Sequence, residues 1–120
     1  MWISASLMIV VALLHTWFMV VEMFLWTTPS VMAKFGMTKE VAESSAVLAA
    51  NQGLYNLFLA AGLVFAMAYR SSDMYMAVST FFLGCIIVAG IYGGFTASKQ
   101  ILLVQALPAA LGLGALWLRV

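Results

Sequence analysis

Four long apolar stretches, separated by short polar ones, constrain what this chain can fold into. They cover about residues 3–26, 45–69, 74–95 and 101–118. A helix needs about 20 apolar residues to cross the hydrocarbon core of a bilayer, and each stretch is close to that length. None alternates polar and apolar residues with the period of two that the wall of a membrane β-barrel requires. The sequence therefore predicts an all-α fold for which the bilayer is the solvent.

The composition excludes the common soluble classes. Of the 120 residues, 66% are hydrophobic and only 8% are charged, whereas a soluble domain carries about 25% charged residues. A water-soluble fold of this size leaves roughly 30% of its unfolded-chain surface exposed, so it could not hide this much apolar surface. The net charge is +1 without a basic patch, which excludes a nucleic-acid partner. The single cysteine, Cys85, excludes a disulfide within the chain.

The connections indicate how the spans are arranged. Short polar turns at residues 70–73 and 96–100 imply that the helices they join are antiparallel neighbours. We expect one membrane domain over residues 1–120, an integral membrane bundle of four transmembrane helices with short turns and one longer first loop. Pro108 either kinks the fourth helix and frees a carbonyl near the polar residues or, as is more common, is tolerated within it. The first stretch lacks a basic start and is too long for a signal peptide, so no cleavage is expected.

The longer loop, residues 27–44, is the most polar part of the chain. Thr38 is a suitable N-cap, and Glu40 would lie in a first helical turn, where the helix dipole favours an acid. The second helix is therefore expected to begin near Lys39, outside the membrane. The loop is either an ordinary connection or a lid over a pocket.

The basic residues carry a weak signal for orientation. Lys34, Lys39 and Lys99 lie on the side of the long loop, and Arg70 and Arg119 lie on the side of the termini. Because cytoplasmic loops carry the excess of basic residues, the balance favours a cytoplasmic loop and termini outside. The difference is a single charge, so insertion in both orientations is conceivable.

An acid inside the first span is the strongest indication of function. Glu22 is the only acid within a predicted span, and an ionisable group near the bilayer centre costs about 2.5–3.5 kcal/mol. His15 lies seven residues earlier on the same helical face. Met19 and Met23 share that face and could bind Cu(I) with His15, although methionine at this spacing more often fills a core. One histidine cannot supply both axial ligands of a haem unless a second chain contributes its own.

Polar residues of the other spans are expected in the same half of the membrane as Glu22. The second span carries four within six positions, and the third and fourth spans carry one each. They are Asn51, Gln52, Tyr55, Asn56, Tyr92 and Gln105. Amides buried in lipid must find hydrogen-bond partners. If the faces that carry these residues converge, the bundle holds a polar pocket below the long loop, lined by them together with Glu22 and His15.

Three classes of function fit this pattern. The first is a protein that binds a small or lipophilic ligand, or transports it, in which Glu22 responds to a proton or cation. The second is an intramembrane enzyme that uses Glu22 and His15 as an acid–base pair on an isoprenoid-, sterol- or quinone-like substrate. The third is a structural assembly protein whose polar residues only join helices. We favour the first class, and the pattern assigns no cofactor.

Small and aromatic residues indicate packing and membrane boundaries. Gly90 and Gly94 form a GxxxG pair, and Ala106, Ala110 and Gly114 form a stripe of small residues. Both features are typical of close helix packing, within the chain or in a homo-oligomer. Aromatic residues at the ends of the spans fit a belt at the membrane interface. They are Trp2, Trp26, Tyr69, Tyr75 and Trp117.

Two segments contain distinctive strings, EMFLWTTP within residues 15–29 and NQGLYN within residues 51–63. They resemble a family of small bacterial four-span membrane proteins catalogued as a domain of unknown function, and the resemblance covers essentially the whole chain. The resemblance implies a multi-pass fold in the bacterial inner membrane, and it implies no reaction. The signature positions that it implies are His15, Glu22, Asn51, Gln52 and Asn56.

Overall fold

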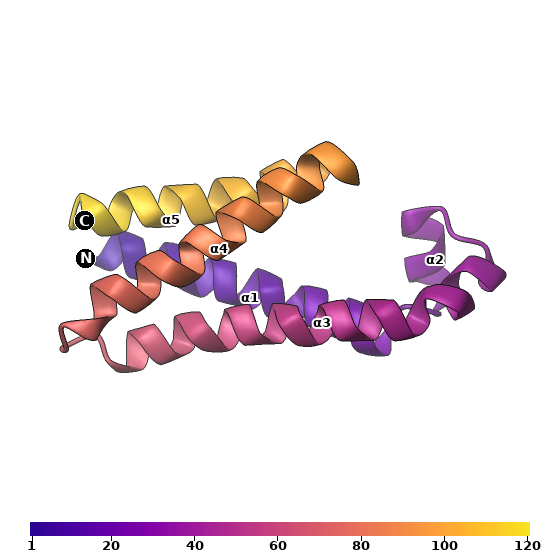
Figure 1. Ribbon diagram of the computed structural model, residues 1–120, viewed down its shortest axis with the longest axis horizontal. Coiled ribbons are helices and arrows are strands. Elements are labelled where there is room, and N and C mark those ends of the chain that lie inside the picture. The colour runs from indigo at the N-terminus through magenta and orange to yellow at the C-terminus, as the bar shows by residue number, and fades with distance from the viewer. The chain divides into compact units, whose positions relative to one another are not determined.

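The computed structural model describes residues 1–120 and is helical throughout (Figure 1). It contains five α-helices, one π-helix and no strand. The elements are α1 (Trp2–Phe24), α2 (Pro29–Phe35), α3 (Lys39–Ala68), α4 (Met74–Thr96), the π-helix η1 (Leu102–Ala106) and α5 (Leu107–Trp117). The prediction of an all-α fold is confirmed.

Three of the helices, α1, α3 and α4, are long and apolar enough to cross a membrane. The fourth apolar segment, Leu102–Trp117, is shorter, because η1 has 5 residues and α5 has 11. Large apolar side chains such as Trp2, Val47 and Phe95 are exposed along these helices. A surface of this kind suits a protein surrounded by lipid.

The chain forms two compact units. The first consists of Met1–Leu14 and Leu59–Val120, and the second of His15–Phe58. Helices α1 and α3 each contribute to both units.

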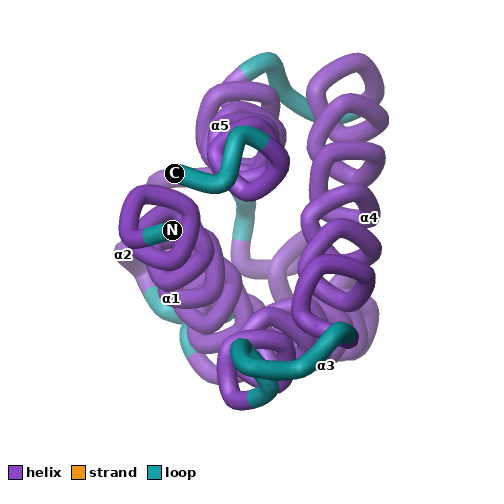
Figure 2. The backbone as a smooth tube through the Cα atoms, turned by 90° about the vertical axis from the view of Figure 1, so that its left-hand side faces the viewer, coloured by secondary structure: helices purple, strands orange, loops and turns teal.

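In the first unit, α4 runs in the opposite direction to η1 and α5 (Figure 1). The two segments are inclined to each other, since Figure 2 views α5 along its axis and α4 from the side. Gly94 lies against Leu102 and Gly90 against Ala106, and a Cβ on Gly90 would be 2.6 Å from the Ala106 backbone nitrogen. Further along the pair, the Trp117 indole Nε1 donates to Thr80 Oγ1 at 3.1 Å. The contacting residues fall along α4 in the reverse of their order along η1 and α5, so η1 and α5 lie beside α4 from Gly94 back to Thr80. The predicted close packing at the GxxxG pair therefore lies within the chain.

The three small residues predicted to form a stripe on the fourth segment differ in burial. Ala106 is buried against Gly90, whereas Ala110 and Gly114 are exposed. Only the first of the three residues therefore contributes to the contact between α4 and the fourth segment.

The π-helix η1 lies in the turn before Pro108. The Leu107 N–H bonds to the Leu102 carbonyl, five residues back. Proline has no N–H to donate, and its ring crowds the carbonyl four residues before it. A wider turn relieves that crowding. This π-helix, which also contains Gln105, was not predicted, and the kink at Pro108 stays a prediction.

The core of the first unit is apolar. Its fully buried members include Met8, Leu63, Leu83, Ile86 and Leu116. Tyr75 is also buried, with 3% of its surface exposed, and its hydroxyl donates to Met8 Sδ at 3.6 Å. Tyr75 is therefore part of the core, and its assignment to the interfacial belt was wrong. The other belt residues of this unit, Trp2, Tyr69 and Trp117, are exposed.

In the second unit, the long loop contains the short helix α2. Pro29 occupies its first turn, where no N–H is needed. Gly36 ends it in the left-handed conformation, with a φ of 62°. The Gly36 N–H bonds to the Ala33 carbonyl at 3.3 Å and the Met37 N–H to the Met32 carbonyl at 2.8 Å. This pattern is the Schellman motif that closes many helices.

Helix α3 begins directly after this turn. The Val41 N–H bonds to Thr38 Oγ1 at 3.2 Å, and Glu40 lies in the first turn of the helix. The predicted N-cap and the predicted start at Lys39 are both confirmed. As a result, α3 has 30 residues and is longer than α1 or α4, which have 23 each.

We expect Gly90→Ala to lower the free energy of unfolding by about 1–3 kcal/mol, because its Cβ would be forced against the Ala106 backbone. Gly84 on the same helix is the matched control, since no atom lies within 4 Å of a Cβ at that position. Gly84→Ala should leave stability unchanged or raise it by up to about 1 kcal/mol through helix propensity. Chemical unfolding in detergent micelles measures both, and equal stabilities would contradict the contact between α4 and η1 at Gly90 and Ala106.

Candidate functional site

Glu22 and Asn56 meet in the second unit. The Asn56 side-chain Nδ2 donates to Glu22 Oε1 at 2.5 Å, and both side chains are half-buried. Glu22 comes from the last turns of α1, two residues before the helix ends at Phe24. Asn56 comes from the middle of α3. The carboxyl group of the first predicted span is thus joined to an amide of the second.

Gly53 allows this hydrogen bond. A Cβ on Gly53 would lie 2.6 Å from Met23 Cγ, 3.1 Å from Glu22 Cβ and 3.2 Å from the Met19 carbonyl oxygen. The two helices therefore touch at Gly53 with no room for a side chain. Asn56 lies three residues further along α3, on a neighbouring part of the same face. Gly53 was not among the predicted site residues, although a glycine three residues before the amide could have indicated it.

A second hydrogen bond joins the chain after α1 to α3. The Trp26 indole Nε1 donates to Ser45 Oγ at 3.0 Å, and Ser45 Oγ in turn donates to the Val41 carbonyl at 2.6 Å. The ring of Phe35 from α2 lies 5.6 Å from the Trp26 ring. Trp26 is therefore held between α2 and α3, in addition to any role at the membrane interface. Ser45 is another residue of this unit that the sequence did not indicate.

His15 is completely buried, and its ring lies 5.2 Å from the Phe18 ring in an edge-to-face arrangement. Seven helical residues separate it from Glu22, which is about 10 Å along α1. Met19 and Met23 both contact α3 at Gly53. No cluster of three or more His, Cys, Asp or Glu side chains is placed to hold a metal ion. The proposed Cu(I) set of His15, Met19 and Met23 stays a prediction.

The remaining polar residues of α3 do not join the Glu22–Asn56 pair. Asn51 is exposed and its Nδ2 donates to the Val47 carbonyl of its own helix at 2.8 Å. Gln52 is exposed as well. Tyr55 is 53% exposed, and its ring lies 6.3 Å from the Phe58 ring. Of the four polar positions in this stretch, Asn56 is the one that bonds to a side chain of α1.

The last two predicted positions, Tyr92 and Gln105, belong to the first unit. Tyr92 is 71% exposed and lines a shallow hollow of about 720 Å³ on α4, together with Phe81, Cys85 and their neighbours. Gln105 is half-buried in η1. The expectation that all four spans contribute to one polar layer stays a prediction.

The Glu22 carboxyl group has no basic partner. The ion pair of the structure joins Lys39 Nζ and Glu43 Oε1 at 3.9 Å on the exposed first turns of α3. A carboxylate can accept about four hydrogen bonds, and Asn56 supplies one. The pair can therefore receive further donors or a positive charge.

The fold and this pair indicate a small, all-helical membrane protein with an acid–amide contact between two helices. The chain matches the family described as "Protein of unknown function (DUF1304)" over residues 9–117, and it belongs to this family. It is 34% identical over 105 residues to the "Uncharacterized protein YpaA" of Lactococcus lactis subsp. lactis (strain IL1403), a match that covers 86% of this chain and 87% of that protein. No solved structure matches the chain. The predicted resemblance to a family catalogued as a domain of unknown function is confirmed, and the four spans stay a prediction.

Replacement of Gly53 tests how the pair is held. We expect Gly53→Ala to separate α1 from α3 in detergent. The free energy of unfolding, taken at the midpoint of thermal unfolding, should fall by about 1–3 kcal/mol. Gly114→Ala is the control, because nothing lies within 4 Å of a Cβ there. Circular dichroism during heating provides the measurement. A Gly53→Ala protein as stable as the Gly114→Ala protein would mean that α1 and α3 do not touch at this point.

Proposed function

We propose that the chain is a multi-pass protein of the bacterial inner membrane that crosses the bilayer four times. Three helices support this by their length and composition. The fourth segment is about 24 Å long at 1.5 Å per residue, which is short for a core of about 30 Å. It nevertheless runs beside α4 from Gly94 to Thr80, so a membrane that contains α4 surrounds this segment at the same depth. Local thinning costs only fractions of a kcal/mol per Å.

Single-cysteine labelling tests the crossings by α3 and α4, since the three positions lie before α3, between the two helices and after α4. With Cys85 replaced by alanine, one new cysteine would be placed at Ala33 in α2, at Ser71 after α3, or at Ser98 after α4. We expect a membrane-impermeant maleimide to label positions 33 and 98 from one side, the cytoplasmic side in our proposal, and position 71 from the other. Labelling of positions 71 and 98 from the same side would contradict a crossing by α4. Half-labelling of every position from each side would contradict a single orientation.

We further propose that Glu22 and Asn56 form the polar part of a site for a small or lipophilic ligand that carries a cationic or hydrogen-bond-donating group. The observation that carries this proposal is the hydrogen bond between them. It fixes the direction of the carboxyl group and leaves most of its acceptor capacity open. A helix contact alone does not require an acid, because glutamine would accept the same bond at a lower insertion cost.

The surroundings of the pair fit the body of such a ligand. The Met23 side chain lines the contact with α3, and a thioether side chain adapts to irregular apolar shapes. The exposed Gln52 and Tyr55 lie near Asn56 on α3. Buried His15 lies about two turns away along α1, which is too far for a direct proton transfer to Glu22. The distance therefore favours ligand binding by Glu22 and Asn56 over acid–base catalysis by Glu22 and His15.

Native mass spectrometry in mild detergent tests the proposal, with octylamine added as a cationic, lipophilic probe. We expect the wild-type protein to retain the amine and Glu22→Gln to retain about tenfold less, since a hydrogen bond to a charged group contributes about 1.5–3 kcal/mol. Glu43→Gln is the matched control, because it removes an exposed carboxylate outside the pair.

Equal retention by all three proteins would contradict the binding site and would leave Glu22 as a helix contact in an assembly protein. Uptake of the amine into proteoliposomes by the wild type alone would extend the proposal to transport. Loss of turnover of a lipophilic substrate in both Glu22→Gln and His15→Ala would instead favour the enzyme interpretation.

A further inference from the structure

Arg70 lies over an exposed tryptophan at one end of the first unit. This end contains both chain termini and the turn between α3 and α4 (Figure 1). The Arg70 Nη2 donates to the Met1 carbonyl at 3.0 Å, and its guanidinium carbon lies 5.5 Å from the centroid of the Trp2 ring. The hydrogen bond and the cation–π contact fix where the guanidinium lies. Arg70 is exposed and forms no ion pair, so most of its donors are free.

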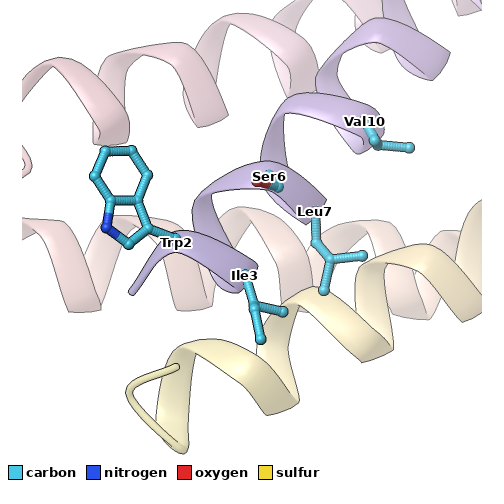
Figure 3. Close-up of a pocket in the computed structure, with 5 residues that line it drawn as sticks. All are labelled: Trp2, Ile3, Ser6, Leu7 and Val10. Atoms are coloured by element: carbon cyan, nitrogen blue, oxygen red, sulfur yellow. The ribbon is translucent and has the colours of Figure 1, made fainter.

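A hollow of about 380 Å³ begins at the same tryptophan. Five residues on one face of α1 line it, as Figure 3 shows. They are Trp2, Ile3, Ser6, Leu7 and Val10. Ile3 and Leu7 point toward α5 (Figure 3), and Leu7 Cβ would be 3.6 Å from a Cβ on Gly112 of that helix. Helix α5 therefore borders the hollow on one side.

This surface becomes less polar from the start of α1 inward. Arg70 and Trp2 lie at the helix end, where indole rings favour the membrane interface. Ser6 follows one turn later, about 6 Å along the axis, and Val10 about 12 Å along it. The exposed Ser6 hydroxyl makes no hydrogen bond within the chain. A cation, a free hydroxyl and an apolar surface thus follow one another from the helix end inward.

We propose that this surface binds one anionic phospholipid. Arg70 donates to the phosphate group, since a guanidinium matches phosphate oxygens with paired N–H groups. The Ser6 hydroxyl donates to an ester carbonyl one turn deeper, and an acyl chain lies along Leu7 and Val10. The positive charge selects an anionic headgroup over a zwitterionic one, because the cationic part of the latter is repelled. This site lies in the first unit and does not depend on the Glu22 proposal.

The test is native mass spectrometry of the full chain in mild detergent with equal amounts of phosphatidylglycerol and phosphatidylcholine. We expect the wild type to retain one phosphatidylglycerol in preference. Arg70→Gln should retain about tenfold less of it, as one charge-assisted hydrogen bond is lost. Arg119→Gln removes another exposed arginine, near the C-terminus at the same end of the first unit, and should retain as much as the wild type. Excess inorganic phosphate should not displace the lipid, because phosphate has no acyl chain.

A second variant keeps the test decisive if Arg70→Gln disturbs the fold. Ser6→Leu removes the hydroxyl and narrows the hollow, with Arg70 left in place, so it should reduce retention of both lipids without changing thermal stability in phosphatidylcholine. Equal retention of the two lipids by the wild type would overturn the proposal. So would an equal loss in Arg70→Gln and Arg119→Gln, unchanged retention in Ser6→Leu, or displacement by phosphate.

Discussion

The contact of α3 with α1 at Gly53 is the constraint on which the candidate site depends. Because Gly53 has no side chain, the helices approach until a Cβ there would meet Glu22 and Met23 at 3.1 and 2.6 Å. At this separation the short side chain of Asn56 reaches the Glu22 carboxyl group. In a lipid environment, where an unpaired polar group is costly, the hydrogen bond and the close contact support each other. The Trp26–Ser45 bond holds the same helices together nearer the loop.

Most of the helical fold could be predicted from the sequence, because long apolar stretches in a chain with few charges permit little except helices in lipid. Two elements could not. Helix α2 has seven residues and arises from the turn preferences of Pro29 and Gly36, which act locally and leave no periodic pattern. The π-helix depends on how Pro108 is accommodated in a helix packed against α4. The helix start at Lys39 was predictable because the Thr38 cap is itself a local signal.

The candidate site was predictable only in part. An acid in an apolar stretch identifies Glu22 from composition alone. Its partner is harder to choose from the sequence. The four polar residues of α3, Asn51, Gln52, Tyr55 and Asn56, are spread over about 140° of the helix, and their spacing does not show which part of that arc is turned to α1. The face turned to α1 is the one that carries Gly53, and this selects Asn56. Similarly, Gly90 and Gly94 indicated close packing, but only the structure shows that their partner is the fourth segment of the same chain.

The most direct test of the account is a double-mutant cycle between Glu22 and Asn56, with each residue replaced by leucine singly and together. The free energy of unfolding would be measured in bicelles for all four proteins. We expect the two substitutions to be coupled by about 0.6 kcal/mol, the average for polar contacts between membrane helices, and by no more than about 1.7 kcal/mol, the largest such value. Effects that add within about 0.3–0.5 kcal/mol, as independent sites do, would contradict it.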